Sequence, residues 1–236
     1  NFPDGTILFT QIALKSIFFV LVIFLVDFVI RKIVGWVLKY ISNKYDIFDW
    51  ESFNDKAKKY EVVATDVITG ESKFFDKNNC SDIISAVKAS ASMPVMSKMI
   101  DVEGRKYLDG GISTSIAYKR AFDVGYSKAI VVLTREEGYR KKPVNKINES
   151  IYKRYFKPLP NLVEKLMTVP ERYNRMQEEM EELAKDGKLL IIRPQNKVTV
   201  QRLEHSSVKL EKLYNEGYEE GLKNIENIKN FIALKF

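Results

Sequence analysis

The sequence predicts an α/β fold in which strands and helices pack in layers. Short apolar runs of strand length alternate with longer segments whose apolar residues recur at helical spacing. Glycine or proline follows several of these segments, as is typical of the ends of helices and strands. With 236 residues, 45% of them hydrophobic, the chain can bury the core of one good-sized domain, or of one domain with an appendage.

The first part of the chain, residues 1–44, differs in composition from the rest. Ser16–Val26 carries no charge. A membrane-spanning helix needs about 20 apolar residues, and residues 6–30 approach this length only if Lys15 and Asp27 lie near its ends. Three interpretations stay open: a membrane anchor, a buried element of the core, or sequence unrelated to the domain that follows.

Residues 45–236 form the second predicted region, a folded domain. Its first strands are expected at Glu61–Thr65 and Ser72–Phe75, because both runs are rich in β-branched or aromatic residues. Thr69-Gly70 lies between them and is a turn signal. The two strands are therefore expected to form a hairpin.

A helix and a second hairpin are expected next. Ser81–Ser90 shows helical periodicity, and Pro94 ends the pattern. Met99–Val102 and Arg105–Leu108 predict two strands that turn at Glu103-Gly104. The apolar face of the helix is expected to consist of Ile83, Ile84, Val87 and Ala91.

The second half predicts further alternation of helix and strand. A helix at Ser115–Val124 is closed by Gly125. The continuous apolar run Lys128–Thr134 indicates a strand buried on both faces of a parallel sheet. Leu189–Arg193 is another candidate for a buried strand.

Long helices account for most of the remaining residues. Pro170–Asp186 predicts a helix that ends at Gly187, and Ser207–Ile232 predicts one or two closing helices. The first helix has an apolar stripe of core type, made of Tyr173, Met176, Met180, Leu183 and Ala184.

The net charge of +7 is unevenly distributed. Between Arg135 and Lys157, eight basic residues stand against three acidic ones. This basic strip either attracts an anionic bilayer surface or is a solvated loop. Binding of nucleic acid is disfavoured, because the aromatic residues form no stacking platform and no known module matches.

Single residues limit the chemistry. Cys80 is the one cysteine, so the chain has no internal disulfide, which suits a reducing compartment such as the cytoplasm. His205, the one histidine, precedes a helical pattern and is expected to be a surface or cap residue. No ligand spacing typical of a metal site is present, and no cofactor is expected.

Asp109-Gly110-Gly111 is the most informative motif. Asp109 ends a short apolar run that predicts a strand, and catalytic residues collect at strand ends in open α/β sheets. A serine hydroxyl is a weak nucleophile that needs a neighbouring base, and a carboxylate can serve. The glycines permit unusual backbone angles and a close approach of the main chain. Asp-Gly is also a common turn dipeptide, so the motif by itself is weak.

The wider sequence resembles the second half of a bacterial patatin-like phospholipase domain. The resemblance is carried by Ala89–Thr134, by Ala64-Thr65-Asp66 with Thr69-Gly70, and by shorter matches between Tyr45 and Gly221. It implies a three-layer α/β fold, incomplete at the N-terminus and with C-terminal helices. It also implies that Asp109 is the base of a Ser–Asp dyad that hydrolyses lipid esters.

The chain departs from this family in two ways. Thr114 and Ala117 stand where the family has Asp or Asn and then Pro, a change that the dyad tolerates. The second departure is larger, because no G-x-S-x-G nucleophile elbow and no glycine-rich oxyanion loop occur in these residues. Ser113 and Ser115 lie too close to Asp109 in sequence to replace the elbow, and turn or helix-cap roles are expected for them. No nucleophile is assigned.

Three further polar residues close to the motif, Thr65, Asp66 and Ser92, are expected to make turn and cap hydrogen bonds. The absence of an initial Met suggests a fragment. The resemblance therefore implies a lipid acyl hydrolase that is inactive in this form, cytoplasmic, and associated with a membrane if residues 6–41 are an anchor. The alternative is a non-catalytic, membrane-tethered binding module on the same scaffold. In either case the expected partner is a lipid or a membrane surface.

The missing elbow generates a first prediction. The chain as given should neither hydrolyse p-nitrophenyl esters above a boiled control nor react with a fluorophosphonate probe, because both reactions need an activated serine. Labelling is measured by intact-protein mass spectrometry. Stoichiometric labelling of any serine would show that a nucleophile is present after all.

Overall fold

The computed structural model describes residues 49–200 and 204–233. The chain divides into two units, Asn1–Lys58 and Lys59–Phe236. The described part of the first unit contains helix α2, Trp50–Asn54, whose N-terminus is capped by Asp49. The predicted anchor within residues 6–41 lies outside the described residues. Within the described ranges, no helix is both long and apolar enough to cross a membrane.

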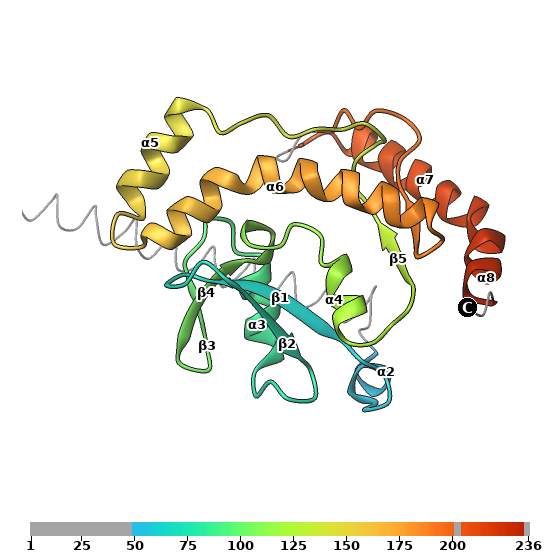
Figure 1. The fold of residues 1–236 in the computed structure, drawn as a ribbon, viewed down its shortest axis with the longest axis horizontal. Helices are drawn as coiled ribbons and strands as arrows, with labels where there is room; N and C mark the ends of the chain where they lie inside the picture. Colours follow the sequence, from blue (N-terminus) through green and yellow to red (C-terminus); the bar gives the residue numbers. More distant parts are fainter. Residues whose placement is uncertain (1–48, 201–203, 234–236) are drawn as a thin grey trace, which may run out of the picture. The chain divides into compact units, whose positions relative to one another are not determined.

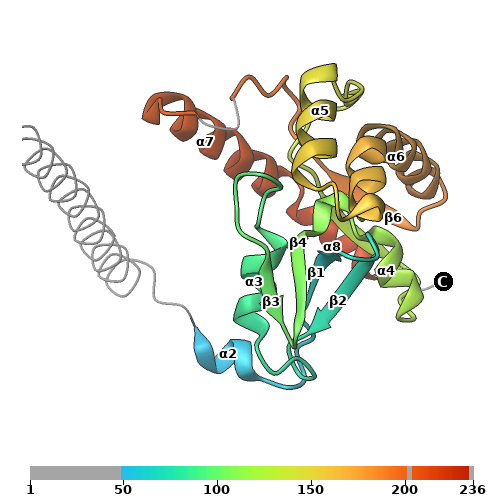
Figure 2. The same ribbon diagram turned by 90° about the vertical axis from the view of Figure 1, so that its left-hand side faces the viewer.

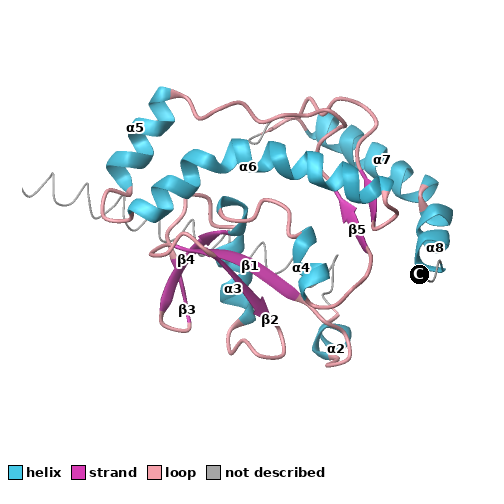
Figure 3. Cartoon of the chain, viewed as in Figure 1, coloured by secondary structure: helices cyan, strands magenta, loops and turns pink. Residues whose placement is uncertain are grey.

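The second unit has a mixed α/β fold, as predicted (Figure 3). Its larger sheet is antiparallel with the order β2-β1-β4-β3 (Figure 1). Both predicted hairpins are confirmed, because β1 pairs with β2 and β3 pairs with β4. The first hairpin turns at Gly70, with φ of +72°, and the second at Glu103 and Gly104, with φ of 54° and 79°. The four strands are β1 (Glu61–Asp66), β2 (Ser72–Asp76), β3 (Ile100–Val102) and β4 (Arg105–Asp109).

Helix α3, Ile83–Ser90, packs against one face of this sheet (Figure 2). Its position is confirmed, but the predicted apolar face is wrong in part. Ala86 and Ala89 are fully buried, whereas Ile84 and Val87 are 42% and 37% exposed. Small side chains on the contact face allow the helix to lie close to the sheet, where Phe75 and Tyr107 fill the space between them.

The smaller sheet consists of β5, Ala129–Val132, and β6, Leu189–Ile192, which pair in parallel from Ala129 and Leu189 onward. The parallel pairing agrees with the prediction, but burial on both faces does not. Val131 is 7% exposed, whereas Val132 is 72% exposed. Among the described elements, α4 and α6 cover one face of this sheet, so alternate side chains of β5 stay outside the core.

Helix α6 spans Pro160–Lys185, ten residues more at its N-terminus than the predicted helix. The prediction began at Pro170, because proline is common in the first turn of a helix. Here Pro170 lies inside the helix and Pro160 starts it. The predicted stripe is confirmed, since Tyr173 and Met180 are buried and Met176 packs beside them.

Helix α6 contacts both sheets (Figure 1). Near its start, Leu162 and Leu166 pack with Leu108 of β4. Near its end, Met180 packs with Val131 of β5. Helix α6 therefore links the two sheets through its two ends.

Two shorter helices complete this packing. Helix α4, Tyr118–Asp123, begins three residues later than predicted, because Gly110–Ile112 forms a separate 3₁₀ turn, η1. Helix α5, Lys146–Tyr155, lies within the basic strip, so the solvated-loop interpretation is wrong for these ten residues. Phe156, directly after α5, is buried beneath α6.

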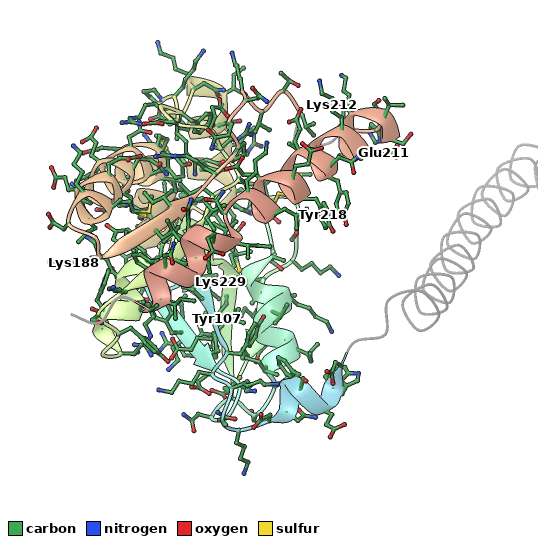
Figure 4. The ribbon with its side chains drawn as sticks, turned by 90° about the vertical axis from the view of Figure 1, so that its right-hand side faces the viewer. Tyr107, Lys188, Glu211, Lys212, Tyr218 and Lys229 are labelled. Carbon is green, nitrogen blue, oxygen red and sulfur yellow. The ribbon has the colours of Figure 1, made fainter. Side chains whose placement is uncertain are left out.

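Two closing helices follow, as predicted: α7, Ser207–Lys223, and α8, Ile225–Ala233. Their apolar side chains are more exposed than the periodicity predicts. Tyr214 and Tyr218 are 70% and 61% exposed and stack on each other at 6.5 Å, and Tyr218 projects from α7 in Figure 4. The spacing of apolar residues in the sequence therefore predicts where these helices lie along the chain, but not what their apolar faces contact.

The chain leaves β4 at its tightest backbone contact. A Cβ atom on Gly110 would lie 2.2 Å from the carbonyl oxygen of Val63 in β1 and 2.7 Å from its Cγ1. Such distances exclude every residue except glycine, unless the main chain moves. Gly110 therefore lets the turn after Asp109 pass directly over β1.

This contact generates a second prediction. Gly110→Ala should lower the free energy of unfolding by about 3 kcal/mol or more, because backbone atoms must shift to admit the methyl group. Gly217→Ala is the matched control, since that position in α7 has no atom within 4 Å and alanine favours a helix by about 1 kcal/mol. Urea denaturation followed by circular dichroism measures both. Equal stability of the two variants would contradict the contact.

Candidate active site

Asp109 is the last residue of β4 and the N-cap of the η1 turn. Its Oδ1 accepts a hydrogen bond from the backbone N–H of Gly111 at 2.7 Å. Among the described residues, no side chain forms an ion pair with this carboxylate and no donor reaches Oδ2. One oxygen therefore fixes the orientation of the carboxylate, and the other remains able to accept a proton.

The main chain of Asp109 is held on both sides. Its N–H donates to the carbonyl of Ser92 at 2.9 Å, and its carbonyl accepts from the hydroxyl of Thr65 at 2.8 Å. Thr65 is fully buried, and its Oγ1 also accepts from the N–H of Ser113. Asp109 is thus fixed by two neighbouring segments as well as by its own strand.

The neighbouring polar residues have the structural roles that were predicted. Asp66 accepts from the N–H groups of Ile68 and Thr69, both at 2.9 Å, and pairs with Arg105 at 2.7 Å. The Ser92 hydroxyl donates to the carbonyl of Lys88 in the last turn of α3. These contacts confirm the turn and cap assignments made for Thr65, Asp66 and Ser92.

The two serines after the motif also make local hydrogen bonds. The hydroxyls of Ser113 and Ser115 donate to the carbonyls of Gly110 and Gly111 at 3.3 and 3.0 Å. Their turn role is confirmed. The cap role is confirmed for Ser113, which is the C-cap residue of η1, but neither serine caps α4, which begins at Tyr118 after Ala117 and has no side-chain cap.

Arg172 of α6 ties the turn after Asp109 to the helix. Its guanidinium donates to the carbonyls of Ile112 and Ser113, and to that of Lys165 at 2.8 Å. Burial lowers the pKa of Arg172, although arginine keeps its charge at any ordinary pH. A charged donor on three carbonyls is a strong restraint, since each such bond contributes more than a neutral one.

Asp109 opens onto a cavity of about 770 Å³. Four elements of the chain supply its walls: the segment after α3, the η1 turn and its continuation, the segment from β5 to α5, and the middle of α6. Much of the lining is apolar, and this part comprises Met93, Pro94, Ile112, Ile116, Val132, Leu133, Val144, Leu166, Val169 and Pro170.

The remaining wall is cationic and aromatic. Arg135, Lys141 and Lys142 line the cavity together with Tyr139 and Tyr173. The Lys141 ammonium lies 4.2 Å from the centroid of the Tyr173 ring, and the Arg135 guanidinium lies 5.0 Å from that of Tyr139. Burial raises the pKa of Tyr173, so its hydroxyl stays neutral.

The other predicted single residues lie away from this cavity. His205 is exposed just before Ser206, the N-cap of α7, as predicted for a surface or cap residue. Cys80 is a free, partly buried cysteine, and burial raises the pKa of its thiol. In the part of the chain that the structure describes, no group of three His, Cys, Asp or Glu residues is placed to hold a metal ion.

Comparison with known families gives one match. The family described as Domain of unknown function (DUF6363) matches residues 159–233. No curated protein matches the chain. The matched segment includes all of α6 together with β6, α7 and α8, and therefore supplies Arg172 and Tyr173 to the site.

The sequence analysis missed the residues that join the site to α6. Asn174 accepts from the backbone N–H of Lys141 at 2.8 Å and donates to the carbonyl of the same residue at 3.0 Å. Both Arg172 and Asn174 bond main-chain groups far away in sequence, and such contacts leave no periodic signal. The one sequence feature that could have indicated these roles is that Arg172 and Asn174 flank Tyr173, a residue of the predicted core stripe.

A third prediction concerns Arg172. Arg172→Met should lower the free energy of unfolding by about 2–4 kcal/mol, because three carbonyls lose a charged donor. The amides of Gly111–Ser113 should also exchange with deuterium faster than those of β2. Urea denaturation and hydrogen–deuterium exchange measure the two effects.

Arg175→Met is the matched control on the same helix, because Arg175 is exposed. It should change the free energy of unfolding by no more than about 0.5 kcal/mol. If Arg172→Met left exchange at the turn unchanged, the proposed restraint on Asp109 would be wrong.

Proposed function

We propose that this chain carries the base-bearing part of a patatin-like serine acyl hydrolase that acts on lipid esters. The observation that carries the proposal is the setting of Asp109. Its carboxylate is oriented by one backbone N–H, keeps a second oxygen for a proton, and faces a cavity lined by apolar as well as polar side chains. A turn carboxylate with only a structural role has no need of such a cavity.

The proposed reaction has two steps. A serine hydroxyl attacks the ester carbonyl while Asp109 takes its proton, and the alcohol leaves with that proton as an acyl-enzyme forms. Water then attacks the acyl-enzyme and gives a proton to Asp109, which passes it to the serine oxygen as the acyl–serine bond breaks and the fatty acid is released. The reaction needs neither a metal nor a redox cofactor.

The shape of the cavity supports a lipid substrate. Ligand pockets commonly enclose about 300–1,000 Å³ and are largely apolar. The cavity of about 770 Å³ falls within this range, and apolar side chains of α6 and η1 form a surface that an acyl chain can contact. Burial of each methylene group contributes about 0.8 kcal/mol to binding.

The serine of the proposed dyad is to be sought in upstream sequence of the same gene. Within the described residues, Ser113 and Ser115 donate to main-chain carbonyls of the η1 turn and are poorly placed to act as nucleophiles. The proposal includes the three-layer patatin-like arrangement, of which α3, the four-stranded sheet and α6 would form the base-bearing portion. A non-catalytic lipid-binding module is the alternative outcome of the test below.

The fourth prediction tests the base. The chain is expressed together with the upstream coding sequence of its gene, and ester hydrolysis is measured with a short-chain phospholipid. Asp109→Asn should lower kcat by about 10²–10⁴-fold, because the amide keeps the turn but cannot accept the proton. Affinity for a lipid analogue should change little.

Asp66→Asn is the control, because Asp66 also caps a turn through backbone N–H groups. It should reduce thermal stability through the loss of its pairing with Arg105, while kcat below the melting temperature stays within about threefold. Retention of more than about a tenth of the rate by Asp109→Asn would contradict the assignment. An upstream sequence without a serine elbow would favour the binding module.

A further inference from the structure

The basic strip between Arg135 and Lys157 separates into two sets in the folded chain. Arg135, Lys141 and Lys142 line the cavity that contains Asp109, and the other basic residues of the strip do not. Two of the latter face outward and pair with carboxylates, Arg140 with Glu178 and Lys153 with Glu149. Only the first set can contact a molecule held in the cavity.

The first set brings several positive charges to one wall. Among the described residues, no carboxylate forms an ion pair with Arg135 or Lys142, and Asp109 is the one acidic residue in the cavity lining. Glu136, which follows Arg135, does not line the cavity, and its Oε2 accepts from the N–H of Val198 at 3.1 Å. The wall therefore carries an excess of positive charge.

Two members of this cationic wall, Arg135 and Lys141, are held in place before any ligand binds. The side-chain amide of Asn174 accepts from the N–H of Lys141 and donates to its carbonyl, and the ring of Tyr173 lies under the Lys141 ammonium. Arg135 rests on the ring of Tyr139 and donates to the carbonyl of Val198 at 3.4 Å. Preorganised charges bind a ligand more tightly, because little side-chain freedom is lost.

Apolar side chains make up about half of the lining residues, so the cavity offers a ligand an apolar surface as well as a cationic one. Met93, Ile112 and Val169 belong to the apolar surface, and the cationic wall lines the same open cavity. A ligand that matches both parts has a hydrocarbon chain and an anionic head on one molecule.

We propose that the cavity selects a lipid with an anionic head, and that Arg135, Lys141 and Lys142 bind that head. The inference rests on the proposed function, because it takes this lipid to be the substrate. It adds to that function the negative charge of the substrate's head group. Binding of this lipid requires no hydrolysis. The binding experiment can therefore contradict this inference without contradicting the proposed function, and the reverse also holds.

The experiment measures binding to the full 236-residue chain by isothermal titration calorimetry. The probes are decyl phosphate, decyl maltoside and inorganic phosphate, with each amphiphile below its critical micelle concentration. Decyl phosphate should bind at least about tenfold more tightly than decyl maltoside, since each well-placed cation is worth about fivefold in affinity. Inorganic phosphate should not displace decyl phosphate at equal concentration.

Charge-removing variants assign the effect to the cavity. Lys142→Gln should weaken decyl phosphate binding about fivefold, and the double variant Arg135→Gln/Lys142→Gln about 25-fold, while decyl maltoside binding stays constant. Lys157→Gln is the matched control, because Lys157 is exposed on the same strip but does not line the cavity. It should leave both affinities unchanged.

Several outcomes would overturn the inference. These are equal affinity for the two amphiphiles, no binding of either, equal binding of inorganic phosphate, or an equal loss in Lys142→Gln and Lys157→Gln. Asp109→Asn distinguishes this inference from the proposed function. That variant should bind decyl phosphate at least as tightly as the unaltered chain, even where it abolishes hydrolysis in the protein with its upstream sequence.

Discussion

The guanidinium of Arg172 joins three main-chain carbonyls from two parts of the fold, and the candidate site depends on this interaction. Two of the carbonyls, those of Ile112 and Ser113, belong to the turn that follows Asp109, and the third belongs to Lys165 in α6. Because α6 also packs against both sheets, the turn is tied to an element that links them. Loss of this contact would therefore reach beyond the turn to the walls of the cavity.

Close packing between the turn after Asp109 and strand β1 is a second restraint on the same turn. Gly110 passes so near Val63 that no side chain fits between them, and this contact fixes where the chain leaves β4. The buried hydroxyl of Thr65 and the carbonyl of Ser92 then hold the main chain of Asp109 itself. The carboxylate is thus oriented by groups that cost no reorganisation when a proton is transferred, which is what a general base requires.

The segment matched by DUF6363 acquires a physical role from these contacts. Within it, three consecutive residues of α6 act on different parts of the site. Arg172 restrains the Asp109 turn, Tyr173 lines the cavity, and Asn174 holds the main chain of Lys141. The helix therefore couples the proposed base to the cationic wall, so the position of the substrate head and that of the base depend on one rigid element.

Local patterns allowed much of the fold to be predicted from the sequence. Both hairpins, the parallel pair of strands and the closing helices follow from turn residues and apolar periodicity, which act over a few neighbours. Periodicity could not decide which face each element buries. The alanines of α3 and the exposed side of β5 depend on how closely other elements approach. The predicted start at Pro170 was wrong because proline is common in the first turn of a helix and disfavoured in its interior, whereas here it lies inside α6.

The sequence by itself determined the Asp109-Gly110-Gly111 motif, the strand that ends there and the turn roles of Thr65, Asp66 and Ser92. Only the tertiary structure decided that Arg172 and Asn174 restrain the site and that three cations of the basic strip share a cavity with Asp109. The physical reason is the range of the interactions. Turns and strands are set by neighbouring residues, whereas Arg172 and Ser113 are 59 positions apart and meet only after the sheet and α6 have packed together.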